Sequence, residues 1–383
     1  MKVLVVNCSY ECRGRGSHAR QKTIAGSLSG YNLGALKLSD WLRFEGHEVT
    51  YWDGDPGVFS YGYDLVCLSV VFSWHAPLAR DIALRVRDYS EIWCGGPGMF
   101  APGIGTWWKK QTGMERVRGL DWRFERQRGE YLATFASRGC PVNCRFCLVP
   151  KMEGTEFTMD DGFQPAPILC DNNLSALPEH FQEHIIGRYQ QEGVPLLDAN
   201  SGFEPRTFTG ETYHRWKSIL RGPWRFALDE FKELDDVRRM MDILRAERRG
   251  RKRVYVLIGN EPIEACYERA EKVIEWGGEP YCQPEMPLNS LSRDNLRVVY
   301  DWTYQQLRDF ARYYNRPALW KSVTLPEYRP RKKEHPPFAH MASPRVIKLP
   351  GPRSSKSSGP ASPTGATDAG TLPMFPMMFP ADL

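Results

Sequence analysis

The chain has 383 residues, 42% hydrophobic and 25% charged, which is enough for two domains with cores of their own and excludes a single small module. Its formal net charge of +5 is too small to indicate a nucleic-acid partner, and no stretch approaches the ~18 consecutive apolar residues of a membrane-spanning helix. Ten cysteines without a secretory signal, since Met1 and Lys2 lead directly into a strand-like run, favour a soluble protein of the reducing cytoplasm.

Residues 1–115 alternate between predicted strands and helices. Short β-branched and apolar runs predict strands at 2–6, 47–52, 64–71 and 91–94, and the spacing of leucines and alanines predicts helices at 33–45 and 77–87. This repeated β-α-β pattern predicts a doubly wound parallel sheet, which binds ligands at the carboxyl ends of its strands. Trp74 and His75 follow the third strand at that end, where a ligand could lie, although a helix cap would explain His75 equally well.

A second β/α series begins at Tyr131, and its first predicted strand, 131–136, leads into a cysteine-rich loop. Cys140, Cys144 and Cys147 are spaced Cys-x-x-x-Cys-x-x-Cys, with Phe146 directly before the last cysteine. Three thiolates on one short loop suit iron and sulfur. A closed zinc site needs a fourth Cys or His at matching spacing, and none is evident nearby. A zinc-binding module without enzymatic activity, or a set of buried thiols, is the alternative.

This loop resembles the motif of the radical S-adenosylmethionine (radical SAM) superfamily, whose members hold a [4Fe-4S] cluster by three cysteines and chelate SAM at the remaining iron. The resemblance implies that Cys140, Cys144 and Cys147 are the cluster ligands. It implies an enzyme in which the reduced cluster cleaves SAM to a 5′-deoxyadenosyl radical that acts on a substrate. It also implies an electron donor such as flavodoxin or ferredoxin. The substrate is not identified by any motif.

Further strands are predicted at 167–170, 194–200, 225–229, 253–259 and 279–284. With the first strand these make six, and the resemblance implies that residues 116–327 form the partial (β/α)6 TIM-like barrel of the superfamily. In such barrels the chemistry lies at the carboxyl ends of the strands, where the cysteine loop stands.

The resemblance also implies that polar residues at these strand ends contact SAM. Those after the second strand would accept hydrogen bonds from the SAM ammonium, those after the third would reach the ribose and sulfonium, and those on the fourth would contact the amino acid or ribose. A glycine after the fifth strand would flank the adenine. The structural alternatives are a simple turn, an ordinary loop and an ion pair between the two fourth-strand residues. In chain order the expected contacts are Asp171, Asn172, Asn173, Asp198, Asn200, Ser201, Arg225, Asp229 and Gly259.

Residues 1–115 resemble the cobalamin-binding-like domain that precedes the barrel in many radical SAM enzymes, whose last strand often ends in Gly-Gly-Pro, as at Gly95-Gly96-Pro97. The histidine that ligates cobalt in related families is missing from the loop after the first strand. We therefore expect either a corrin held without a protein nitrogen on cobalt, or a domain that keeps only the fold. The implied reaction is a cobalamin-dependent methyl transfer or a rearrangement. A methylthiotransferase-like enzyme is the alternative, disfavoured because no carboxyl-terminal RNA-binding β-domain follows.

Residues 328–383 are rich in Pro, Ser, Gly and basic side chains, which predicts a disordered tail. The sequence accordingly predicts that truncation after Pro326 removes little buried surface and costs little stability.

Overall fold

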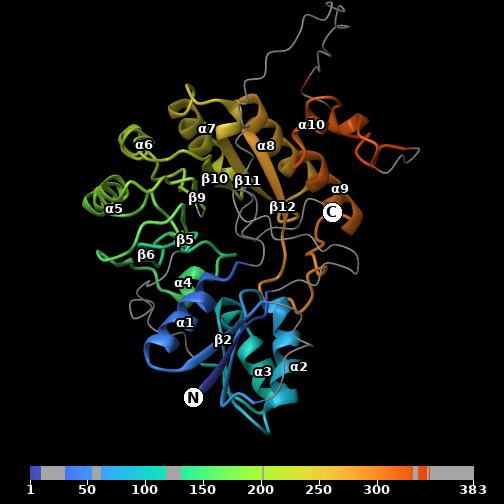
Figure 1. Ribbon diagram of the computed structural model, residues 1–383. Coiled ribbons are helices and arrows are strands. Elements are labelled where there is room, and N and C mark those ends of the chain that lie inside the picture. Colours follow the sequence, from blue (N-terminus) through green and yellow to red (C-terminus); the bar gives the residue numbers. More distant parts are fainter. Residues whose placement is uncertain are drawn as a thin grey trace, which may run out of the picture.

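The computed structural model describes residues 1–9, 31–53, 62–117, 131–200, 202–330, 335–342 and 345. These residues form a mixed α/β protein with two regions, each built on parallel strands (Figure 1). The N-terminal region occupies the lower part of Figure 1 and the second region the upper part. Within the part of the chain that is described, no helix has the length and apolarity needed to cross a membrane.

The predicted parallel sheet of the N-terminal region is confirmed. Its strands pair in the order β2-β1-β3-β4, so the chain moves from β1 to one side and then returns to the other. The resulting switch point lies between β1 and β3, which is where open α/β sheets bind ligands. The elements are β1 (Lys2–Asn7), α1 (Leu33–Phe44), β2 (Glu48–Trp52), β3 (Leu65–Ser69), α2 (Ala76–Val86), β4 (Glu91–Gly95) and α3 (Ile104–Thr112).

Both faces of this sheet are covered because the strands are apolar on both sides. Val3 and Val5 of β1 pack with Ala35 and Leu42 of α1 on one face. Leu4 and Val6 belong to a second cluster, which includes residues of α2 and α3, on the other face. The period-2 alternation of a strand therefore sends successive β1 side chains to two separate cores.

Two glycines after β4 allow this segment to approach the segment after β3. Gly96 has φ +100°, and a Cβ there would lie 2.6 Å from the carbonyl oxygen of Val70. A Cβ on Gly98 would lie 2.4 Å from the carbonyl carbon of Phe72. Close backbone packing thus accounts for both glycines without a ligand.

The second region contains two three-stranded parallel sheets, β5-β8-β9 and β10-β11-β12. An isolated parallel bridge between Leu196 and Leu220 links them, together with hydrogen bonds from the Arg221 N–H to the Leu196 carbonyl (2.9 Å) and from the Phe203 N–H to the Arg225 carbonyl (2.9 Å). The six strands thus follow one another in chain order. They are β5 (Ala133–Thr134), β8 (Ile168–Leu169), β9 (Asp198–Ala199), β10 (Trp224–Leu228), β11 (Lys252–Ile258) and β12 (Glu279–Pro284).

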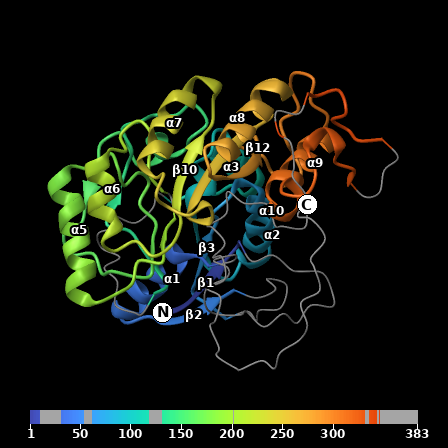
Figure 2. The same cartoon turned by 90° about the horizontal axis from the view of Figure 1, so that it is seen from above.

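Helices lie on the outer side of these strands when the molecule is viewed from above (Figure 2). The strand predicted at 131–136 is shorter than expected, because the Ala136 N–H donates to the Asp171 side chain instead of a neighbouring strand. Residues beyond it form β6 (Ser137–Arg138), which pairs antiparallel with β7 (Thr158–Met159). The helices are α4 (Val149–Met152), α5 (Glu179–Glu192), α6 (Gly210–Lys217), α7 (Leu234–Ile243), α8 (Ile263–Glu275), α9 (Tyr304–Tyr314) and α10 (Pro317–Trp320).

The described residues beyond position 327 pack onto the second region. Tyr328, Phe338 and Met341 are at most 8% exposed, and the Phe338 ring meets Phe310 of α9 edge to face. Arg345 forms an ion pair with a glutamate of α8. The prediction that the chain buries little surface beyond position 327 is therefore wrong for these residues, whereas 331–334, 343–344 and 346–383 lie outside the described part.

The two regions meet at the carboxyl end of the N-terminal sheet. The Ser73 hydroxyl, after β3, donates to the Ser290 carbonyl in the loop after β12 (2.6 Å), and Leu288 and Leu291 of that loop pack on the core beneath α2 and α3. A second contact places Lys37 of α1 over the Phe135 ring at 4.1 Å. Both contacts bring the edge of the N-terminal sheet toward the second region (Figure 1).

Candidate metal centre

The three cysteines of the predicted cluster site lie on the loop between β6 and α4. Cys140, Cys144 and Cys147 are half-buried and form no disulfide. Main-chain hydrogen bonds shape the loop, from the Cys147 N–H to the Cys144 carbonyl (3.0 Å) and from the Cys140 N–H to the Gly154 carbonyl (3.2 Å). Burial raises the pKa of the Cys147 thiol, and the charges of Cys140, Glu153 and Asp229 raise it further, so the cysteines lie within range of each other's charge.

Gly139 is required directly before the first cysteine. Its φ is +90°, and a Cβ there would lie 2.1 Å from the carbonyl oxygen of Glu156. Only glycine tolerates both this backbone conformation and this close approach. The loop is therefore held tightly against the segment that follows it in the chain.

Polar side chains of neighbouring segments also hold the cysteine loop in place. Arg138 and Glu153 form an ion pair, and the Glu153 carboxylate also accepts from the Gly139 N–H (3.3 Å). The Asn172 amide donates to Glu153 (2.6 Å) and to the Gly139 carbonyl (3.2 Å). Asn172, expected to contact SAM, thus uses its amide N–H groups to hold the cysteine loop.

Asp171 is fully buried beneath the loop. Its oxygens accept hydrogen bonds from the Ala136 N–H (2.8 Å) and from the Ser137 hydroxyl. Burial raises the pKa of this carboxyl to about 6, although the two hydrogen bonds oppose the shift. This side chain thus anchors the end of the first strand, and its expected contact with the SAM ammonium stays a prediction.

Asp198 and Arg225 form a buried ion pair, each at most 1% exposed. Two hydrogen bonds of 2.6 and 2.7 Å join the guanidinium to the carboxylate, and Arg225 also donates to the hydroxyl of Tyr255. The charge of Arg225 lowers the pKa of Asp198, but burial outweighs it and the net shift is upward. The arginine bonds across to β9, so the alternative pair between Arg225 and Asp229 is wrong, whereas the expected SAM contacts of Asp198 and Arg225 stay predictions.

The other expected contacts at the third and fifth strands stay predictions. Asn200 is 7% exposed and opposes the burial that raises the pKa of the Cys170 thiol. Gly259 ends β11 with φ +86°, and a Cβ there would lie 3.0 Å from the Leu307 side chain, so a tight turn accounts for it. Ser201 lies outside the described residues.

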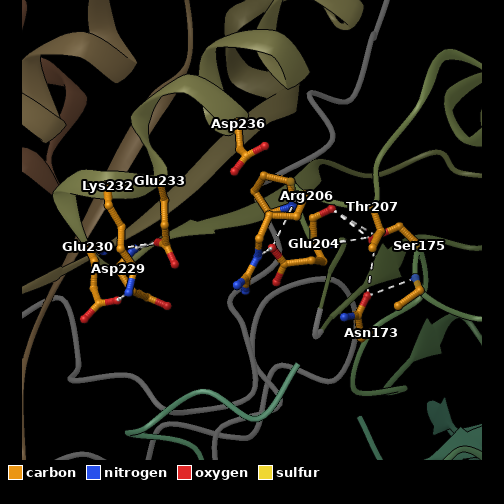
Figure 3. Close-up of polar contacts among 12 residues, drawn as sticks. Asn173, Ser175, Glu204, Arg206, Thr207, Asp229, Glu230, Lys232, Glu233 and Asp236 are labelled. Carbon is orange, nitrogen blue, oxygen red and sulfur yellow. Dashed lines mark hydrogen bonds and ion pairs between the residues drawn. The ribbon is translucent and has the colours of Figure 1, made fainter. Parts of the chain in front are cut away.

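Asp229 is the predicted fourth-strand residue whose charge acts on the cysteine loop. Its half-buried carboxyl has no hydrogen-bond or ion-pair partner among the described residues, and its charge acts on Cys147. Burial and the nearby Glu233 raise the pKa of Asp229 to about 7. Its backbone is fixed by the Asn260 amide, which donates to the Asp229 carbonyl (2.6 Å). Figure 3 shows Asp229 beside Glu233 at the end of β10.

Two charged residues near the cysteine loop were not selected by the sequence analysis. Glu204 and Arg206 follow β9, and the Arg206 guanidinium donates to the Glu204 carboxylate (2.6 Å) (Figure 3). Burial raises the pKa of the Cys144 thiol to about 11, against the opposing effect of the nearby Arg206 guanidinium. The available signal was the charged Glu-Pro-Arg triplet in the loop that follows the third strand.

The donor set suits an iron–sulfur cluster better than a single ion. In the described residues, no group of three or more His, Cys, Asp or Glu side chains converges closely enough to hold one metal ion. Cluster thiolates bind different iron atoms, so they need not converge in that way. Three soft sulfur donors on one loop, half-open to solvent, match the ligands that such clusters take.

A second group of polar atoms stands at the switch point of the N-terminal sheet. Ser9, after β1, and Trp74 and His75, after β3, carry buried side-chain atoms, among them both imidazole nitrogens, that have no hydrogen-bond partner in the described part of the chain. Trp74 stacks on Phe72 with centroids 4.3 Å apart. His75 precedes α2 but its side chain makes no capping hydrogen bond, so the capping alternative is wrong. Burial lowers the pKa of His75 to about 4, and Arg293 adds to the shift.

Both candidate sites lie at carboxyl ends of parallel strands, where α/β proteins place their ligands. The cysteine loop follows β5 and β6, and the unpartnered polar atoms follow β1 and β3. Comparison of the chain with protein-family models and with curated proteins finds no match.

Proposed function

We propose that this chain is a radical SAM enzyme in which Cys140, Cys144 and Cys147 hold a [4Fe-4S] cluster. The main observation in support is that three half-exposed thiols share one tightly anchored loop near the first of six parallel strands, which follow one another in chain order. We propose further that these strands form a partial (β/α)6 barrel. The bound cluster would supply the electron that splits SAM into methionine and a 5′-deoxyadenosyl radical able to abstract hydrogen from a substrate.

The residues of the chain would bind and orient these groups. Gly139 and the Arg138–Glu153 pair hold the cysteine loop in one conformation, so the thiolates need little reorganisation on binding iron. Asp229 is our candidate for the SAM ammonium, because its carboxyl is half-buried, has no partner among the described residues, and lies near enough for its charge to act on Cys147. A cation beside it would lower its raised pKa and keep it ionised.

The ligation test is anaerobic reconstitution with iron and sulfide, followed by iron analysis and a SAM cleavage assay. The wild type should take up about four iron atoms per chain and cleave SAM under reducing conditions. Cys144→Ser should lose both properties. The matched control is Cys170→Ser, because Cys170 is also a half-buried free cysteine but does not lie on the loop. A Cys144→Ser protein with full iron content would refute the assignment.

We also propose that cobalamin binds at the switch point of the N-terminal sheet. A buried polar atom without a partner costs about 1–3 kcal/mol, so a ligand that pairs with Ser9, Trp74 and His75 would gain affinity there. The expectation of a corrin without a protein nitrogen on cobalt stays a prediction. A bond between His75 and cobalt would contradict this prediction.

The cobalamin test measures cobalt that stays with the protein through gel filtration after incubation with hydroxocobalamin. The wild type should retain cobalt, and His75→Phe should retain less because its side chain pairs with nothing polar. Trp108→Phe is the control, since Trp108 also has a buried unpartnered N–H but lies on α3. Absence of cobalt from the wild type would reject the proposal. Nitrogen splitting in the Co(II) spectrum that His75→Phe abolishes would reject a corrin without a protein nitrogen.

A further inference from the structure

Each thiol of the cysteine loop has an N–H group near its sulfur. The Asn173 amide donates to Cys140 Sγ (3.7 Å), and the nearby Arg206 guanidinium lowers the pKa of the Cys144 thiol. The backbone N–H of Val149 acts in the same way on the pKa of Cys147. Two of the three donors are therefore side chains from other loops, one after β8 and one after β9.

The orientation of the Asn173 amide is fixed by its other hydrogen bonds. Its oxygen accepts from the Ala176 N–H (3.2 Å), and the Ser175 hydroxyl lies 3.4 Å from the same oxygen. An exchange of the oxygen and nitrogen would place the NH2 group against the Ala176 N–H, donor against donor. Asn173 is only 4% exposed, so water does not offer a substitute. The NH2 group must therefore point at Cys140.

The Ser175 hydroxyl joins the two donor loops into one unit. It accepts from the Glu204 N–H (2.8 Å) and from the Thr207 hydroxyl (2.9 Å), as Figure 3 shows. Glu204 in turn holds Arg206 through the carboxylate–guanidinium bond. The position of the guanidinium next to Cys144 is thus coupled to the position of the amide next to Cys140.

We propose that Asn173 and Arg206 are positioning residues that bind the thiolates of Cys140 and Cys144 and raise the reduction potential of the cluster. The inference rests on the proposed function. Reduction adds one electron, delivered by a low-potential one-electron donor, and so increases the negative charge on the thiolates. An N–H donor or a positive charge at the sulfur stabilises that state more than the oxidised one. Asn173 thereby serves the cluster rather than the SAM ammonium.

The test is a redox titration of the reconstituted protein without SAM, followed by electron paramagnetic resonance and with iron content measured on each sample. Asn173→Asp keeps an acceptor for the Ala176 N–H but removes the donor to Cys140. Arg206→Gln removes the charge near Cys144. Because the Arg206 side chain is partly exposed, this variant should fold even if the substitution at the buried Asn173 is not tolerated. Each variant should make reduction about tenfold less favourable, which is a shift of ~59 mV to lower potential for one electron.

Two further variants separate a cation next to the Cys144 sulfur from the general charge of the loop. Arg206→Lys should restore most of the potential, because an ammonium can still reach the sulfur. Arg145→Gln removes a charge from the cysteine loop itself, where Arg145 pairs with Glu230 (3.1 Å) and is half exposed, and it should shift the potential little.

The outcomes distinguish the inference from the proposed function. Full iron content with unshifted potentials in both Asn173→Asp and Arg206→Gln would overturn the inference and leave the proposed function standing. A shift in Arg145→Gln as large as that in Arg206→Gln would also overturn it. A wild-type protein that takes up no iron would overturn the two together.

Discussion

Truncation after Pro326 should strongly destabilise the second region. It removes Tyr328, Phe338, Met341 and Arg345, all of which pack against that region's core. Phe338 is 0% exposed and fits against Phe310, so its loss resembles a buried Phe→Ala substitution, which costs about 3–5 kcal/mol. The removal of two further buried side chains adds about 1.5 kcal/mol or more for each.

The loss of Arg345 adds an electrostatic cost. Its guanidinium binds Glu271, donates to the Trp320 carbonyl (2.8 Å) and reaches the Tyr313 hydroxyl (3.0 Å). The Glu271 carboxylate is 5% exposed and, of its partners in the described residues, would keep the hydroxyl of Tyr314 (2.6 Å). The total of more than about 6 kcal/mol is comparable to the roughly 5–15 kcal/mol that stabilises a whole protein.

The assay is urea unfolding followed by tryptophan fluorescence and circular dichroism. Midpoints are compared because a chain with two packed regions need not unfold in one step. Phe338→Ala and Arg345→Met in the full chain should lower the midpoint individually, whereas Phe44→Ala, at a 59% exposed phenylalanine, should change it little. A truncated chain with the midpoint of the full chain would refute the reasoning.

Three further predictions concern charge and backbone geometry. The fold favours the neutral form of His75, so the contribution of this residue to stability is present above about pH 6.5 and is lost toward pH 4. In urea unfolding, the wild type should lose up to about 3 kcal/mol more stability than His75→Phe over this pH interval. The comparison with His75→Phe is needed because the raised pKa of Asp171 changes stability in the opposite direction. Arg225→Met should cost about 3–5 kcal/mol of stability, because it leaves Asp198 charged and buried. Adding Asp198→Leu should recover much of that loss. Equal urea midpoints for the single and double variants would count against a buried ion pair. Gly139→Ala should keep the circular dichroism spectrum but reduce iron uptake, and unchanged uptake would show that the loop tolerates a Cβ.

Local sequence patterns were sufficient to predict the parallel N-terminal sheet and the position of the cysteine loop. Apolar β-branched runs such as Val3–Val6, separated by helical spacing, specify strands and their parallel connection because both features depend on neighbours close in the chain. The sixth strand of the second region was predicted with its observed bounds, Glu279–Pro284, for the same reason. The three cysteines lie within eight residues of one another, from Cys140 to Cys147, so their loop could be recognised without the fold.

The tertiary structure decided which polar residues are available to a ligand. Asp198 and Asp229 both stand at strand ends and look equivalent in the sequence, yet the first is buried against Arg225 while the second stays half-open beside the cysteine loop. Phe338 is similarly surrounded by Pro and basic residues that predict no core, and it is buried only because α9 presents Phe310 to it. Burial and ion pairing depend on partners tens of residues away in the chain, and a local pattern contains no information about which of them arrives.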